Sequence, residues 1–108
     1  MLFRSEFPNY PADSLPVLLL ASPFTDESYH NDVCPSFVVE MDGRPVRVFA
    51  DFPDMGDREY PELPRFRAYY DDDDYGEVPD VASDDIRDVV EWLGARGVRF
   101  GAYVGGCR

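Results

Sequence analysis

The stretch SFVVEMDGRPVRVF, residues 36–49, decides the fold. Two runs rich in β-branched and aromatic residues, 36–41 and 44–49, flank Asp42-Gly43, the dipeptide that favours a type I′ turn. A two-residue loop fixes which residues of the two strands face each other. It therefore puts four apolar side chains on one face of a β-hairpin, in two cross-strand pairs: Val39 with Val46, and Phe37 with Val48.

Pro45 falls opposite Glu40 in this register. Proline has no N–H group to donate to a neighbouring strand, so it is confined mainly to edge strands within sheets. The presence of Pro45 therefore suggests that its strand lies at the edge of the sheet.

The segment after the hairpin predicts a loop and then a third strand. Residues 53–64 contain three prolines and a glycine and are expected to form the loop. In the strand expected over residues 65–70, alternate side chains point to opposite faces. One face then carries Phe66 and Ala68, and the other carries Arg67 and Tyr69.

A helix is expected over residues 83–96. Ser83 is a suitable N-cap, and Asp84 and Asp85 lie in the first turn, where the helix dipole favours negative charge. Gly97 is placed to end the helix. Apolar residues recur at helical spacing and form one stripe: Ile86, Val89, Val90 and Leu93. Residues 98–104 are expected to form a last strand.

These elements predict an α+β fold in the order β-β-β-α-β. A small antiparallel sheet of about four strands would pack against one C-terminal helix. The 108 residues suffice for a single domain with one core, residues 1–108. Within it, residues 1–35 form an irregular, proline-rich extension, with 15–20 as a candidate short edge strand, and residues 36–104 hold the folded elements.

The bulk charge restricts the classes of partner. The chain has 22 acidic and 10 basic residues, a net charge of −12 and a sequence pI of about 4.2. Such a chain repels nucleic acid and anionic membranes and is steered towards basic proteins. The only long apolar run, residues 15–21, contains a proline and is too short for a membrane span or a signal peptide. A cytoplasmic location is therefore expected, with Cys34 and Cys107 as free thiols.

The negative charge is concentrated in residues 71–91. Ten carboxylates and one arginine give this segment −9 of the total charge of −12. In the expected helix, at about 100° per residue, Asp84, Asp88 and Glu91 fall within roughly 60° of one another, opposite the apolar stripe. With Asp85 they place four carboxylates along about 10.5 Å. This spacing is similar to the roughly 3.4 Å between phosphates along one DNA strand.

Three interpretations of the acidic segment are open: a solvated helix face, a surface that binds a basic groove, or a weak divalent-cation site at residues 71–74. Neighbouring aromatic side chains, including Trp92, favour the binding surface, because such residues are common interface anchors. No cofactor is expected. The candidate partner-binding residues are Asp71, Asp72, Asp73, Asp74, Glu77, Asp84, Asp85, Asp88, Glu91, Tyr69, Tyr70 and Tyr75.

Catalytic and metal-binding signals are weak. An EF-hand loop beginning at Asp71 is excluded, because its twelfth position is Ala82, where a bidentate glutamate is required. The only histidine, His30, lies four residues before Cys34. This pair could serve nucleophilic catalysis or contribute to a metal site, but local hydrogen bonding and packing are the simpler reading. We therefore expect no enzyme and no dedicated metal site.

Residues 30–37 (HNDVCPSF), together with 10–13 (YPAD), resemble segments of small proteins from bacterial mobile elements. In size and acidity the whole chain is similar to phage-encoded anti-CRISPR and anti-restriction proteins. Proteins of that class often present carboxylates that mimic DNA phosphates.

This likeness implies an inhibitor that binds a basic host protein or ribonucleoprotein complex, with a CRISPR effector favoured. It implies no direct contact with nucleic acid or membrane. In a phage-encoded protein, the site of action would be the host bacterial cytosol. The alternative is an immunity protein or antitoxin that neutralises a basic nuclease toxin, since both use the same electrostatics. A structural or regulatory protein whose acidity only keeps it in solution is a third possibility.

Overall fold

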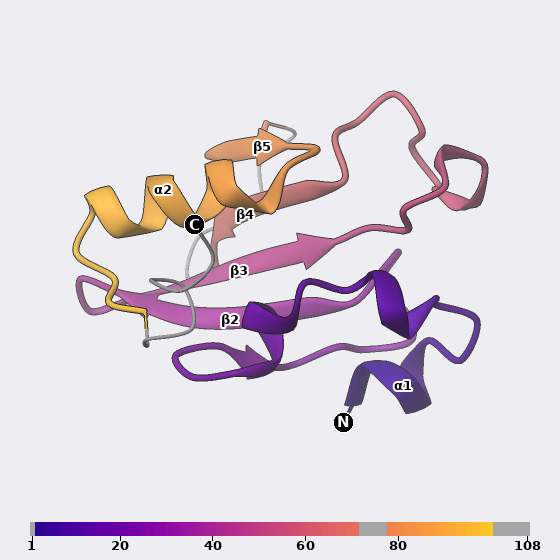
Figure 1. The fold of residues 1–108 in the computed structure, drawn as a ribbon, viewed down its shortest axis with the longest axis horizontal. Coiled ribbons are helices and arrows are strands. Elements are labelled where there is room, and N and C mark those ends of the chain that lie inside the picture. The colour runs from indigo at the N-terminus through magenta and orange to yellow at the C-terminus, as the bar shows by residue number, and fades with distance from the viewer. Residues whose placement is uncertain (1, 72–77, 101–108) are drawn as a thin grey trace.

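A computed structural model describes residues 2–71 and 78–100 (Figure 1). Its sheet has five antiparallel strands in the order β1-β2-β3-β4-β5. The α+β class predicted from the sequence is confirmed, with a main helix near the C-terminal end. The elements, in chain order, are α1 (Leu2–Glu6), β1 (Thr25–Asp26), β2 (Ser36–Met41), β3 (Arg44–Ala50), β4 (Phe66–Tyr70), β5 (Val81–Ser83) and α2 (Ile86–Ala95).

The central hairpin has the predicted turn and register. Asp42 and Gly43 both have positive φ, 54° and 79°, as a type I′ turn requires. The cross-strand partners are the expected ones, including Val39 with Val46 and Phe37 with Val48. These four side chains are fully buried, so the hairpin supplies the middle of the core.

The inference that Pro45 marks a sheet edge is wrong. Strand β3 is central, with β2 on one side and β4 on the other. Pairing with β4 begins at Val46, opposite Tyr70, and the carbonyl of Pro45 accepts from the N–H of Asp71 at 2.8 Å. At this position the pairing between β3 and β4 uses only the carbonyl of residue 45, so the missing N–H of proline is not needed.

Two short strands, β1 and β5, lie at the edges of the sheet, outside the three predicted strands β2, β3 and β4. Strand β1 pairs with β2 through Thr25 and Asp26, and β5 pairs with β4 immediately before α2. The strand expected after the helix is absent from residues 98–100, and the remainder of that prediction, 101–104, lies outside the described residues.

Helix α2 is shorter at its start than predicted. Ser83 belongs to β5, and the N-cap is Asp85, whose side chain accepts from the N–H of Arg87 at 3.0 Å. At the other end Gly97 has φ of 96°, and the N–H groups of Gly97 and Val98 donate to the carbonyls of Gly94 and Leu93. This is a Schellman motif, and it confirms Gly97 as the residue that ends the helix.

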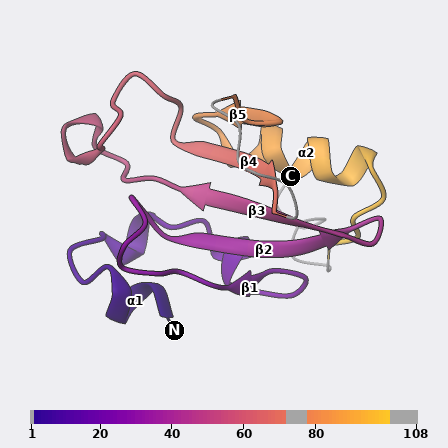
Figure 2. The same cartoon turned by 180° about the vertical axis from the view of Figure 1, so that it is seen from behind.

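The N-terminal segment is more ordered than an irregular extension. It forms α1 and two 3₁₀ turns, Ala12–Ser14 and Val17–Leu20, so the edge strand considered for residues 15–20 is wrong. In Figures 1 and 2 this segment and α2 lie against the same face of the sheet. Its core side chains include Phe3, Tyr10, Leu15, Leu19 and Phe24, which share one apolar cluster with the hairpin and with Val89 and Leu93 of α2.

None of the described helices combines the length and apolar character that crossing a membrane requires.

The turn geometry predicts opposite effects for two glycine-to-alanine changes. Gly43→Ala should lower the free energy of unfolding by about 1–2 kcal/mol, because an L-residue with a Cβ disfavours positive φ. Gly94→Ala, in α2 with open space around its Cα, should raise it by about 0.5–1 kcal/mol. Urea unfolding of the two variants measures both. Equal effects of the two changes would contradict the assigned turn.

Candidate acidic binding surface

The exposed part of the predicted acidic tract lies on α2 and in the turns on either side of β5, which is adjacent to α2 in Figure 1. Asp88 and Glu91 project from the solvent-exposed side of α2, and Asp80 lies in the turn before β5. Asp84, between β5 and α2, has a side chain that is 78% exposed. We call these four residues the α2 acidic surface. Asp88 and Glu91 line one hollow together. Asp80 and Asp84 lie at opposite ends of β5, where they accept from Tyr70 and Arg65 at the two ends of β4. The helical clustering predicted for Asp84 with Asp88 and Glu91 is wrong for Asp84, which precedes the N-cap of α2.

Several of these carboxylates also hold the local backbone. Asp80 accepts from the N–H of Tyr70 at 3.2 Å, and Asp84 accepts from the N–H of Arg65 at 2.9 Å. Asp88 accepts from the hydroxyl of Ser83 at 2.6 Å. These bonds fix the carboxylates in position while leaving them exposed, so the surface is preorganised.

Three predicted carboxylates lie beside the protein's own arginines. Asp71 lies 2.9 Å from Arg47, and its side chain is only 20% exposed. Asp85 lies 2.7 Å from Arg87, whose hydrogen bonds hold the pKa of the Asp85 carboxyl below its usual value. Asp84 lies 3.8 Å from Arg58 but stays exposed. All three therefore add less to an outward negative field than the sequence suggested.

The remaining predicted members of the site, Asp72, Asp73, Asp74, Tyr75 and Glu77, lie outside the described residues.

The two described tyrosines of the predicted site point to opposite faces of the sheet. Tyr69 packs edge-on against Phe49, with ring centroids 5.9 Å apart, on the face away from the core. Tyr70 packs on the core face against Trp92, with centroids 6.2 Å apart. They do not form one aromatic patch beside α2, because adjacent residues of a strand alternate between faces.

A shallow hollow of about 350 Å³ adjoins the α2 acidic surface. Its lining includes Asp88 and Glu91 together with the side chains of Val81 and Trp92. Trp92 is only partly exposed, and the guanidinium of Arg96 lies 4.3 Å from its ring centroid. The acidic surface thus borders an apolar area, although the aromatic anchor there is already in contact with a cation.

Three arginines are directed inwards onto carbonyl oxygens. The guanidinium of Arg58 donates to the carbonyls of Phe52, Leu63 and Pro53, at 2.7, 3.2 and 3.2 Å. Arg65 donates to the carbonyl of Asp51 and the hydroxyl of Tyr10, both at 2.9 Å. These cations serve mainly the interior and the loops, and Arg58 also lies 3.8 Å from the exposed carboxylate of Asp84.

The third inward arginine, Arg67, forms a buried ion pair with Asp51 at 3.1 Å. It also donates to the carbonyl of Pro64 at 2.9 Å. The sequence analysis missed this pair: strand alternation put Arg67 on the face opposite Phe66 and Ala68, where an exposed side chain is expected, and its partner Asp51 lies 16 residues away along the chain.

His30 and Cys34 do not form a site together. The exposed His30 interacts through Nδ1 with Glu6 at 2.9 Å, and this hydrogen bond lowers the pKa of the Glu6 carboxyl. Cys34 is a fully buried free thiol, and burial raises its pKa well above the ordinary value. Among residues 2–71 and 78–100, no group of three or more histidine, cysteine or acidic side chains is arranged to hold a metal ion.

Comparison with known proteins assigns no family. No family model, no curated protein and no solved structure matches the chain.

Breaking the buried ion pair should strongly destabilise the fold. Arg67→Met keeps most of the side-chain volume but leaves the Asp51 carboxylate buried without its cation. The expected loss is about 3–5 kcal/mol in the free energy of unfolding. As the matched control, Arg87→Met removes an exposed arginine from an ion pair and should change stability little. Urea unfolding compares them, and similar losses in both variants would contradict this role of Arg67.

Cys34 should resist thiol reagents until the protein unfolds. In a Cys107→Ser variant, Cys34 is the only thiol. The reactive species is the thiolate, and burial raises the thiol pKa, so neutral and mildly alkaline buffer should leave it protonated. The rate of reaction with an aromatic disulfide reagent, followed by absorbance, should therefore rise sharply across the urea transition. Fast reaction in native buffer would contradict the buried placement.

Proposed function

We propose that the protein is an inhibitor of the anti-CRISPR or related anti-defence kind, which docks an acidic surface on the basic nucleic-acid-binding surface of a host defence complex. Its carboxylates would stand in for DNA phosphates, so the complex could bind either DNA or the inhibitor. The proposed contact residues are those of the α2 acidic surface: Asp80, Asp84, Asp88 and Glu91.

The observation that carries this proposal is the segregation of charge between interior and surface. Arg65 and Arg67 direct their guanidinium groups to carbonyl oxygens or to a buried carboxylate, and Arg58 serves loop carbonyls as well as Asp84. The members of the α2 acidic surface stay exposed. The net charge of −12 would steer the protein towards a cationic cleft.

The hydrogen bonds that hold these carboxylates in place support the same proposal. Three of the four carboxylates are held by hydrogen bonds from Tyr70, Arg65 and Ser83. A partner would then immobilise few additional rotamers on binding, which lowers the entropic cost of association. A solvated face whose only task is to keep the protein in solution does not need such fixing.

Reversing charge on the helix should abolish competition with DNA. The double variant Asp88→Arg/Glu91→Arg changes two exposed positions of α2. We expect it to inhibit DNA binding by a purified CRISPR effector complex at least about tenfold less well than the parent, because like charge then faces a basic groove. Fluorescence anisotropy of a labelled target duplex measures the inhibition. The potency of the parent protein should also fall as salt rises.

The matched control is Asp13→Arg/Glu40→Arg, which makes the same change in net charge at two exposed positions outside the α2 acidic surface. It should keep most of the inhibition. If both doubles lose activity equally, only the total charge matters. If the α2 double is fully active against every effector that the parent inhibits, the acidic surface is not the contact.

A further inference from the structure

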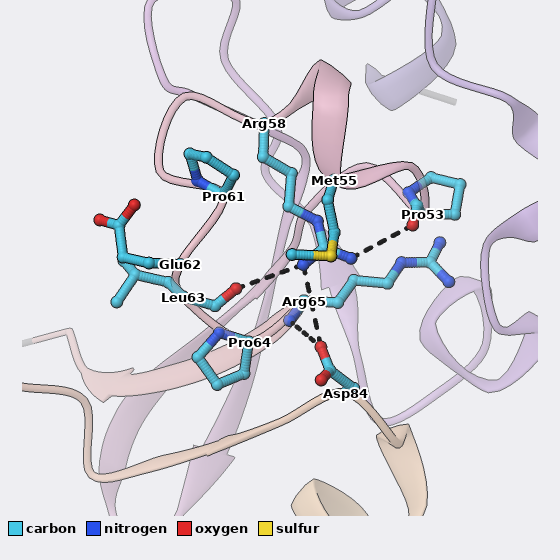
Figure 3. Close-up of a pocket in the computed structure, with 9 residues that line it drawn as sticks. All are labelled: Pro53, Met55, Arg58, Pro61, Glu62, Leu63, Pro64, Arg65 and Asp84. Carbon is cyan, nitrogen blue, oxygen red and sulfur yellow. Dashed lines mark hydrogen bonds and ion pairs between the residues drawn. The ribbon is translucent and has the colours of Figure 1, made fainter.

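The connection between β3 and β4 borders a second hollow, of about 420 Å³, which sequence patterns did not predict (Figure 3). The segment over residues 53–64 has one 3₁₀ turn, Met55–Asp57, and no other regular element. The lining combines three prolines with Met55 and Leu63. Two arginines and two carboxylates, Arg58, Arg65, Glu62 and Asp84, complete the lining, which is therefore mixed.

Arg58 holds this loop in shape from the inside. Figure 3 shows its guanidinium among the lining residues, with bonds to the carbonyls of Leu63 and Pro53 and an ion pair to Asp84. Its side chain is only 6% exposed, and a third bond joins it to the carbonyl of Phe52. Because the guanidinium is used by the loop itself, the hollow is preformed and the cation is not offered to a ligand.

Apolar side chains of the loop are left exposed. Met55 is 57% and Tyr60 is 48% exposed, and both belong to the few large apolar side chains of the described residues that solvent reaches. Methionine adapts its shape to different partners, and tyrosine is a common interface anchor. The loop thus resembles a protein-binding surface more than a connection that only spans two strands.

The charges around the hollow decide what kind of segment it accepts. The exposed charged residues of the loop are all acidic: Asp54, Asp57, Glu59 and Glu62. Of these four, Glu62 lines the hollow, and Asp84 adds a second carboxylate to the lining. The second arginine of the lining, Arg65, donates to the carbonyl of Asp51 and the hydroxyl of Tyr10. Like Arg58, it is therefore occupied by bonds within the protein. An approaching polypeptide therefore meets apolar contacts beside a rim formed by the exposed carboxylates of Glu62 and Asp84.

We propose that this hollow is a second docking site, which receives an apolar side chain from a basic segment of a partner protein. The occupant is a residue such as leucine, flanked by arginine or lysine. The leucine would contact Met55, Leu63 and the prolines, and the flanking cations would face the carboxylates of the rim. The site is formed by the loop and by Asp84, which also belongs to the α2 acidic surface, and the proposal holds whether or not that surface competes with DNA.

Three blocked tripeptides separate the two parts of the recognition: acetylated and amidated Arg-Leu-Arg, Glu-Leu-Glu and Arg-Gly-Arg. Each is titrated into the full chain while NMR follows the methyl group of Met55 and the amides of Gly56 and Leu63. Arg-Leu-Arg should give saturable shifts. Arg-Gly-Arg should bind roughly tenfold more weakly, because it lacks the buried leucine. Glu-Leu-Glu should bind at least about threefold more weakly, because its charges are repelled.

Two variants locate the binding. Glu62→Arg should weaken Arg-Leu-Arg by roughly threefold or more, whereas Glu40→Arg, an exposed glutamate on β2, should not. The Asp88→Arg/Glu91→Arg double should bind the peptide as the parent does, which separates this site from the α2 acidic surface. Equal shifts from all three peptides, no shift from Arg-Leu-Arg, or equal losses in the Glu62 and Glu40 variants would overturn the proposal.

Discussion

The buried carboxylate of Asp51, at the end of β3, is the point on which the arrangement of this molecule depends. Its oxygens accept from Arg67 at 3.1 Å and from the N–H of Phe52 at 2.9 Å. Its backbone carbonyl accepts from Tyr10 and Arg65, and its N–H donates to the carbonyl of Arg65. One residue thus joins β3, the start of β4 and the N-terminal segment. A charge this deep is tolerated because each polar atom has a partner.

This use of arginine connects the interior to the surface. A guanidinium that binds a backbone carbonyl or Asp51 is less able to screen an exposed carboxylate. In the described part of the chain, no buried side-chain nitrogen or oxygen lacks a hydrogen-bond partner. The same inward arginines order the proline-rich loop after β3, which has little secondary structure of its own. The negative surface and the preformed hollow are therefore consequences of one way of distributing cations.

Most of the sheet and the helix could be predicted because local physics sets them. The positive φ values that Asp42 and Gly43 adopt fix the hairpin register, and the register fixes which valines are buried. Apolar spacing and Gly97 located α2 and its end. Predictions were wrong where pairing with a neighbouring strand determined the local structure. Ser83 is drawn into β5 by pairing with Phe66, and Pro45 is tolerated in a central strand because only its carbonyl is used there.

The sequence by itself determined the α+β class, the hairpin, the apolar stripe of the helix and the concentration of carboxylates near residue 80. Those features depend on residues close together in the chain. Only the tertiary structure decided which carboxylates stay exposed, because the arginine that balances Asp71 lies 24 residues away along the chain, at Arg47. It also decided that the N-terminal segment covers the sheet and that the loop after β3 borders a hollow. Ion pairs and packing between distant segments depend on the spatial arrangement, which spacing along the chain does not encode.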